Sequence, residues 1–128
     1  RLIYLMQNRE GNFIINRIKS VKYALKGAYL LVRFEPSIQV QVIIAIVMCG
    51  LGFYFNISST EWILQLLTIS LVISIEGINT AIEKIADFIH PNFNISIGLI
   101  KDVAAGAVFI ASVFAVIIGL IIYLPKII

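Results

Sequence analysis

Residues 61–89 read EWILQLLTISLVISIEGINTAIEKIADFI, and this stretch decides the fold. Between Trp62 and Ile75 no residue is charged, whereas charged residues gather in the second half. As an α-helix the segment is about 43 Å long, which exceeds a hydrocarbon core of about 30 Å. We therefore predict a membrane-spanning helix whose charged C-terminal end projects out of the hydrocarbon. Ser58 and Glu61 have the spacing of a capping box at its start.

Apolar runs on both sides of this segment predict two further spans. Residues 37–55 end in the aromatic residues 53–55, which are typical of a membrane interface. Residues 97–124 form the third run. Small residues let membrane helices approach closely, and both later spans have ridges of them. The ridges are Ser74, Gly77 and Ala81 on the second span and Ala104, Ala107, Ala111 and Ala115 on the third.

The composition of the whole chain agrees with a membrane protein. Of 128 residues, 60% are hydrophobic and 13% are charged, whereas soluble domains have about 25% charged residues. A chain of this length has too little interior to bury so much apolar surface. We therefore expect one all-α membrane domain over residues 1–128. No P-loop or kinase glycine loop is present, which excludes a soluble-type nucleotide-binding fold at the level of motifs.

An amphipathic helix is predicted before the first span, over residues 12–34. Its apolar residues recur every three or four positions, and basic residues fall on an adjacent stripe. Such a helix lies in the membrane interface with its apolar side toward lipid; a helix packed on other protein is the alternative. Glu35-Pro36 ends it, because the residue before proline disfavours the α conformation. Residues 1–11 are expected to be a frayed lead-in.

The distribution of lysine and arginine predicts the orientation in the membrane. These residues concentrate before the first span and around the loop between the second and third spans, while the loop between the first two spans has none. The positive-inside rule then places the N-terminus and the second loop in the cytoplasm. The basic residues are interleaved with apolar ones, which favours an anionic membrane surface or a phosphorylated ligand over nucleic acid.

Four polar residues of the second span share one face. On a helix, Glu76, Asn79, Glu83 and Asp87 fall within about 80° of one another. Glu76 lies near the inner edge of the hydrocarbon, where an ionised carboxylate is costly and is therefore a candidate functional group. Glu83 and Asp87 lie further along, at the water boundary. We call these four residues the acidic stripe.

The acidic stripe suggests phosphoryl transfer to a lipid hydroxyl. A carboxylate at the depth of Glu76 can accept a proton from a hydroxyl. Carboxylates in the wet zone bind magnesium, and Glu83 and Glu35 are the best placed. Lys101 can neutralise phosphate oxygens. Such a reaction needs mainly positioning and charge neutralisation, so a small site is sufficient.

Other interpretations of these residues stay open at this level. Glu76 and Asn79 can form a hydrogen-bonding pair between helices, and the remaining charges can be solvated helix ends. A small proton-coupled exporter that uses Glu76 is the alternative function, and a non-catalytic membrane subunit is a third. Cys49 is expected to be a packing residue, and His90 is a lone loop histidine without metal-ligand spacing.

The second span and the start of the third carry a family resemblance. Glu76-Gly-Ile-Asn79-Thr-Ala-Ile-Glu83-x-x-x-Asp87, with Lys101-Asp102-Val-Ala-Ala-Gly-Ala-Val downstream, resembles the signature of the prokaryotic diacylglycerol kinase and undecaprenol kinase family. The resemblance covers roughly residues 13–125. It implies a homotrimer in the bacterial inner membrane, with composite active sites at subunit interfaces. It also implies Mg²⁺-ATP as the phosphoryl donor and a lipid alcohol, diacylglycerol or undecaprenol, as the acceptor.

The same resemblance implies roles for individual residues, and two positions depart from the family pattern. Asn16 stands where the family often has an arginine, and the adjacent Arg17 is its expected substitute. Ala105 stands where some members have serine. By position, the resemblance implies the general base Glu76 with Asn79 beside it, the magnesium ligands Glu35 and Glu83, and an ATP site that includes Arg17, Tyr23, Asp87, Lys101 and Asp102.

Overall fold

The computed structural model describes residues 1, 3 and 13–128. In this part the chain forms four long helices and no strand, so the predicted all-α fold is confirmed. The expected frayed lead-in over residues 1–11, apart from residues 1 and 3, lies outside the described residues, as does the predicted helix start at residue 12. The chain divides into two compact units, residues 1–34 and 35–128.

Helix α2, Phe13–Phe34, is the described helix of the first unit and matches the predicted amphipathic helix. None of its residues is buried within the structure. Ile14 and Leu25, both on the predicted apolar stripe, are 71% and 66% exposed. An exposed apolar stripe on a helix is the surface that an interfacial helix presents to lipid.

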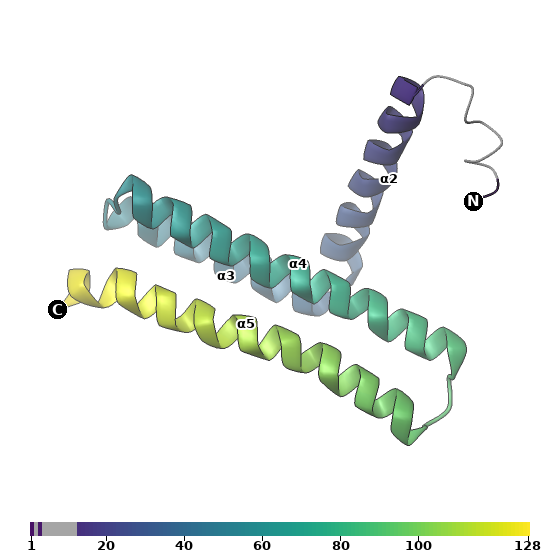
Figure 1. The fold of residues 1–128 in the computed structure, drawn as a ribbon. Coiled ribbons are helices and arrows are strands. Elements are labelled where there is room, and N and C mark those ends of the chain that lie inside the picture. Colours follow the sequence, from purple (N-terminus) through teal and green to yellow (C-terminus); the bar gives the residue numbers. More distant parts are fainter. Residues whose placement is uncertain (2, 4–12) are drawn as a thin grey trace. The chain divides into compact units, whose positions relative to one another are not determined.

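Three helices form a bundle in the second unit: α3 (Pro36–Tyr54), α4 (Ser59–Ile89) and α5 (Ile95–Ile127). Each is long and apolar enough to cross a membrane, which confirms the three predicted spans. Helix α4 runs alongside both α3 and α5 (Figure 1). Most large apolar side chains of the three helices face outward, as expected where lipid rather than water surrounds the bundle.

The helix boundaries differ from the prediction because two caps extend α4 and α5. The Ser58 Oγ accepts from the Glu61 N–H at 3.2 Å, and the Ser58 N–H donates to Glu61 Oε1 at 2.9 Å. This capping box was predicted, but the helix begins at Ser59, directly after its cap, and not at residue 61. Asn94 caps α5 through bonds from the N–H groups of Ser96 and Ile97, so that α5 begins at Ile95 instead of residue 97.

Helix α5 also continues past its predicted end at residue 124, through Pro125 to Ile127. A proline forfeits one backbone hydrogen bond of a helix. Two other contacts hold the last turn: the Ile128 N–H donates to the Leu124 carbonyl at 3.0 Å, and the Lys126 ammonium donates to the Ile122 carbonyl at 3.2 Å.

The turn between α3 and α4 depends on one close approach. Gly52 is buried and lies against the indole ring of Trp62. That ring also packs against Phe53 in a tilted arrangement, at 4.9 Å between ring centroids. A Cβ on Gly52 would lie 2.8 Å from two atoms of that indole. Asn56 then takes a φ of 51°, a left-handed conformation that asparagine tolerates better than most residues.

We therefore expect Gly52→Ala to destabilise the bundle. The added methyl group overlaps a rigid aromatic ring, and such overpacking costs about 1–3 kcal/mol. Thermal unfolding in detergent micelles, followed by circular dichroism, measures the change. Gly50→Ala is the matched control, because a Cβ there meets nothing within 4 Å. Equal melting temperatures for the two variants would contradict the assignment of Gly52 as a packing glycine.

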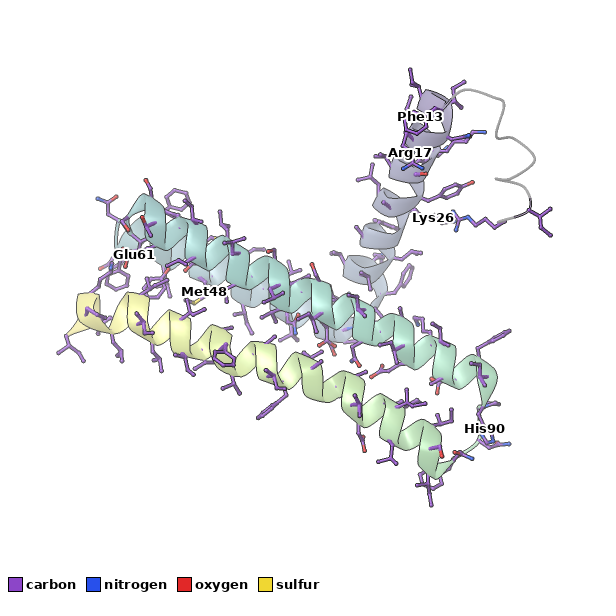
Figure 2. The ribbon with its side chains drawn as sticks, viewed as in Figure 1. Phe13, Arg17, Lys26, Met48, Glu61 and His90 are labelled. Carbon is purple, nitrogen blue, oxygen red and sulfur yellow. The ribbon has the colours of Figure 1, made fainter. Side chains whose placement is uncertain are left out.

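A polar cluster joins all three helices near the same end of the bundle. The Tyr123 hydroxyl on α5 donates to Gln65 Oε1 on α4 at 2.5 Å and lies 3.1 Å from the Met48 carbonyl on α3. The Gln65 Nε2 donates to the same carbonyl at 3.2 Å. Close by, the Lys126 ammonium contacts Glu61 Oε2 at 2.7 Å. Figure 2 shows Met48 and Glu61 toward this end, which we call the Glu61 end, and His90 at the opposite end.

Removal of the Tyr123 hydroxyl should loosen this end of the bundle. Tyr123→Phe leaves the buried Gln65 Oε1 without its donor, and we expect a loss of about 1 kcal/mol, since side-chain hydrogen bonds inside membranes average slightly less than this. Tyr54→Phe removes a hydroxyl from a residue that is 81% exposed and is the control. A Tyr123→Phe variant as stable as Tyr54→Phe in the same melting experiment would show that the cluster does not stabilise the bundle.

Candidate active site

Two contacts set the register of α3 against α4 away from the Glu61 end. Gln41 Nε2 on α3 donates to Glu76 Oε2 on α4 at 3.4 Å. The Lys84 ammonium on α4 lies 3.2 Å from Glu35 Oε1, at the start of α3. Glu35 therefore faces the charged half of α4.

Helix α5 is held against α4 in an equally regular register. Lys101 Nζ donates to Asp87 Oδ1, and Tyr123 bonds Gln65 further along the same pair of helices. Counting the same number of residues away from the Tyr123–Gln65 pair along each helix leads to Glu76 on α4 and to Ser112 on α5. Ser112 is therefore level with Glu76 in this antiparallel pair.

The acidic stripe divides into a buried and an exposed part. Glu76 and Asn79 are 8% and 7% exposed, whereas Glu83 and Asp87 are exposed to the surroundings. Asn79 links the two parts, because its Nδ2 donates to Glu83 Oε1 at 3.3 Å. The Oδ1 of Asn79 is buried and has no hydrogen-bond partner among the described residues. The stripe therefore offers a sheltered carboxylate next to water-accessible ones.

A large groove runs along the bundle from Glu76 toward the Glu61 end. Its volume is about 1070 Å³, and residues of α3, α4 and α5 line it. Its walls are mainly apolar. Ser37, Gln41, Glu76 and Ser112 line it at one end, and Gln65 and Tyr123 at the other. We call it the chain groove, since its apolar walls suit a hydrocarbon chain and its Glu76 end suits a polar group.

Six of the residues that the sequence singled out lie on the three helices of the bundle or at their ends, and two pairs of them are in direct contact, Asn79 with Glu83 and Lys101 with Asp87. The six are Glu35, Glu76, Asn79, Glu83, Asp87 and Lys101. Asp102 is exposed in the second turn of α5, next to Lys101. Arg17 and Tyr23 lie on α2, in the other unit, so their membership of the site stays a prediction. The Arg17 guanidinium lies 5.4 Å from the centroid of the Phe13 ring.

Sequence reasoning missed Gln41 and Lys84 as partners of two site carboxylates. Gln41 is one of two glutamines in the apolar run 37–55, and that polarity was an available signal. Gln39 is the other, and only the rotation of α3 shows that Gln41 faces Glu76 while Gln39 is exposed. His90, taken as a lone loop residue, has its Nδ1 2.8 Å from the Asn92 carbonyl oxygen.

The oxygen atoms at the charged end of α4 suit magnesium better than a softer metal. Among residues 1, 3 and 13–128, no three Asp, Glu, His or Cys side chains gather into a group that could hold a metal ion. Glu35, Glu83 and the unpartnered Asn79 Oδ1 nevertheless provide hard oxygen donors. Magnesium is commonly held by one or two carboxylates together with substrate phosphates, and this donor set fits that pattern.

Comparison with known proteins identifies relatives of this chain. The model of the family described as prokaryotic diacylglycerol kinase matches residues 22–123. An undecaprenol kinase of Bacillus subtilis is 35% identical over 122 residues, which cover 94% of this chain and 99% of the relative. A diacylglycerol kinase of Haemophilus influenzae is 30% identical over 94 residues, which cover 73% of this chain and 80% of the relative.

Proposed function

The chain belongs to the prokaryotic diacylglycerol kinase family, and on this premise we propose that it transfers the γ-phosphoryl group of ATP to the hydroxyl group of a membrane lipid alcohol. The observation that carries the proposal is the position of Glu76. This carboxylate is buried at the polar end of an apolar groove in a membrane bundle. A lipid alcohol has the matching shape, with one hydroxyl group at the end of a hydrocarbon chain.

Glu76 is the proposed general base. With the hydrocarbon chain in the chain groove, the lipid hydroxyl lies beside Glu76. The carboxylate takes the hydroxyl proton, the lipid oxygen forms a bond to the γ-phosphorus, and the bond from that phosphorus to the bridging oxygen of ADP breaks. The products are a lipid phosphate and ADP. Burial of Glu76 excludes water that would otherwise compete as the acceptor.

The exposed end of the bundle is the proposed nucleotide side. Lys101 and Asp87 contact each other there, and both side chains are partly exposed. The Lys101 ammonium can therefore offset the charge of a bound phosphate. The family resemblance also assigns Asp102, Tyr23 and Arg17 to the proposed ATP site. Glu83 and Glu35 would hold Mg²⁺, with Asn79 orienting Glu83. When bound, this ion screens the phosphate charges and favours attack at phosphorus.

We propose that a long polyprenol is the preferred acceptor over diacylglycerol. The chain groove has lining residues from Ser37 to Phe55 of α3, a length of about 27 Å, which is close to the full hydrocarbon thickness of about 30 Å. A chain confined to one leaflet reaches only about half that depth. The undecaprenol kinase of Bacillus subtilis also aligns with more of this chain than the diacylglycerol kinase of Haemophilus influenzae.

The proposal includes an orientation and an assembly. The N-terminus and the loop between α4 and α5 face the cytoplasm, where ATP is available, and the lysine and arginine distribution supports this. The active form is a homotrimer with sites shared between subunits, as the family resemblance implies. The proton-coupled exporter is not proposed, because the relatives are named as kinases.

The test is phosphate transfer from labelled Mg²⁺-ATP to undecaprenol and to diacylglycerol, side by side in mixed micelles. We expect label in both lipids and a higher kcat/KM for undecaprenol. Higher kcat/KM for diacylglycerol would overturn the acceptor preference alone. If neither lipid is labelled, although circular dichroism shows that the protein is folded, the proposed function is overturned.

A further inference from the structure

Gln41 is a residue of the chain groove to which the proposed reaction gives no role. It lines the groove together with Glu76, and its Nε2 donates to Glu76 Oε2 at 3.4 Å. This distance is long for a hydrogen bond, but such bonds in ligand-free sites often tighten when the substrate is bound. Gln41 Oε1 is buried and has no hydrogen-bond partner in the part of the chain that the structure describes.

The contact with Glu76 fixes which way the amide points. As the ionised base of the proposed reaction, the Glu76 carboxylate only accepts hydrogen bonds, so the nitrogen of the amide faces Glu76 and its oxygen faces away. A flipped amide would place two acceptor oxygens against each other. The unpartnered atom is therefore the acceptor, and it needs a donor.

A buried acceptor without a donor destabilises a helix pair, and an apolar residue at position 41 would avoid that cost. Packing alone therefore does not account for a glutamine at this position. Asn79 repeats the arrangement one turn along α4, since its Nδ2 donates to Glu83 while its Oδ1 is also unpartnered. Each of the two amides thus holds one site carboxylate and presents one free acceptor oxygen.

We propose that Gln41 positions Glu76 for proton transfer and receives the hydroxyl group of the entering lipid. This inference rests on the proposed kinase function. The Gln41 N–H engages Oε2 of Glu76, which leaves Oε1 of that carboxylate to take the proton. The hydroxyl first donates to Gln41 Oε1 and then turns to Glu76, where its O–H bond breaks as the oxygen bonds to the γ-phosphorus and ADP leaves. Because Gln41 Oε1 is an acceptor, it recognises a substrate group only if that group can donate a hydrogen bond, as a hydroxyl group does.

Two substitutions separate the two functions of the amide. Gln41→Glu keeps acceptor oxygens but replaces the neutral N–H donor by a second carboxyl group beside Glu76, where the two groups compete for one proton. We expect kcat to fall about 10-fold or more with KM for undecaprenol within about twofold. Gln41→Met removes donor and acceptor at similar size, and we expect the same fall in kcat with KM raised about 5-fold or more. Gln39→Glu and Gln39→Met are the matched controls on the exposed face of α3, with both constants within about twofold of wild type.

Glu76→Gln is measured beside these variants so that the two proposals can fail separately. If Glu76→Gln is inactive while both Gln41 variants keep wild-type kcat and KM, the Gln41 proposal is wrong and the base assignment stands. If Glu76→Gln stays active, the base assignment fails and the Gln41 proposal fails with it. A normal kcat for Gln41→Glu alone would overturn the donor role. Circular dichroism in the same micelles shows whether each variant is folded. If Gln41→Met is unfolded, the kcat of Gln41→Glu alone tests the positioning role.

Discussion

Glu76→Gln is expected to lower kcat by about 10²- to 10⁴-fold, which is the usual contribution of a positioned general base. Glutamine has nearly the same size and keeps one acceptor oxygen for the Gln41 amide, so the bundle should fold as before. The KM for ATP should change little, because the proposed nucleotide site lies at the exposed end of α4. Initial rates of phosphate transfer to undecaprenol, with ATP and lipid varied in turn, measure each constant.

Glu61→Gln is the control for this experiment. Glu61 is a carboxylate of the same helix, but it caps α4 and pairs with Lys126 at the opposite end of the bundle. We expect its loss to reduce thermal stability and to leave kcat near the wild-type value. A Glu76→Gln enzyme with more than about a tenth of wild-type kcat would contradict the general-base role, because a positioned general base contributes at least about 100-fold.

The second large effect is expected from loss of the divalent cation and of the carboxylates proposed to hold it. Chelation with EDTA should abolish turnover, and restoration of Mg²⁺ should recover it. In Glu83→Gln, one proposed ligand is lost and the bond from the Asn79 amide is weakened, so we expect about a 10-fold or greater rise in the Mg²⁺ concentration for half-maximal activity. Titration of activity with Mg²⁺ at fixed ATP measures this shift.

Glu35→Gln should raise the Mg²⁺ requirement in the same direction, and Glu61→Gln should leave it unchanged. Direct binding of Mn²⁺ with ATP, followed by electron paramagnetic resonance, separates a binding defect from a catalytic one. A Glu83→Gln variant that binds Mn²⁺-ATP like the wild type and has an unchanged Mg²⁺ requirement would remove Glu83 from the metal site. The proposed base would be unaffected by that result.

Much of the fold could be predicted from the sequence because membrane helices are specified by local properties. The length and apolarity of a span follow from consecutive residues, and all three spans were predicted within three residues of their observed ends. The capping box at Ser58 is also local, whereas the Asn94 cap and the passage of α5 through Pro125 were missed. Asparagine before a helix is a known signal, so the Asn94 cap was readable. The helix past Pro125 depended on contacts in its last turn.

Part of the candidate site was also predictable. The acidic stripe follows from helical periodicity alone, and the cost of a carboxylate in hydrocarbon singled out Glu76. In the structure, neighbouring helices bury Glu76 and Asn79, whereas Glu83 and Asp87 are exposed. The hydrogen-bond and ion-pair partners of these residues were not predictable. Some of the partners lie on another helix, and the other contacts form only in one side-chain conformation.

The sequence by itself determined the number of spans, their lengths and the polar face of α4, since all of these arise from the spacing of residues along one chain segment. Only the tertiary structure decided that Gln41 and not Gln39 faces Glu76, that Lys84 contacts Glu35, and that three helices enclose a groove. These features depend on the rotation and register of one helix against another. That rotation is set by packing over the whole bundle, for example by the approach of Gly52 to Trp62, and not by any single stretch of residues.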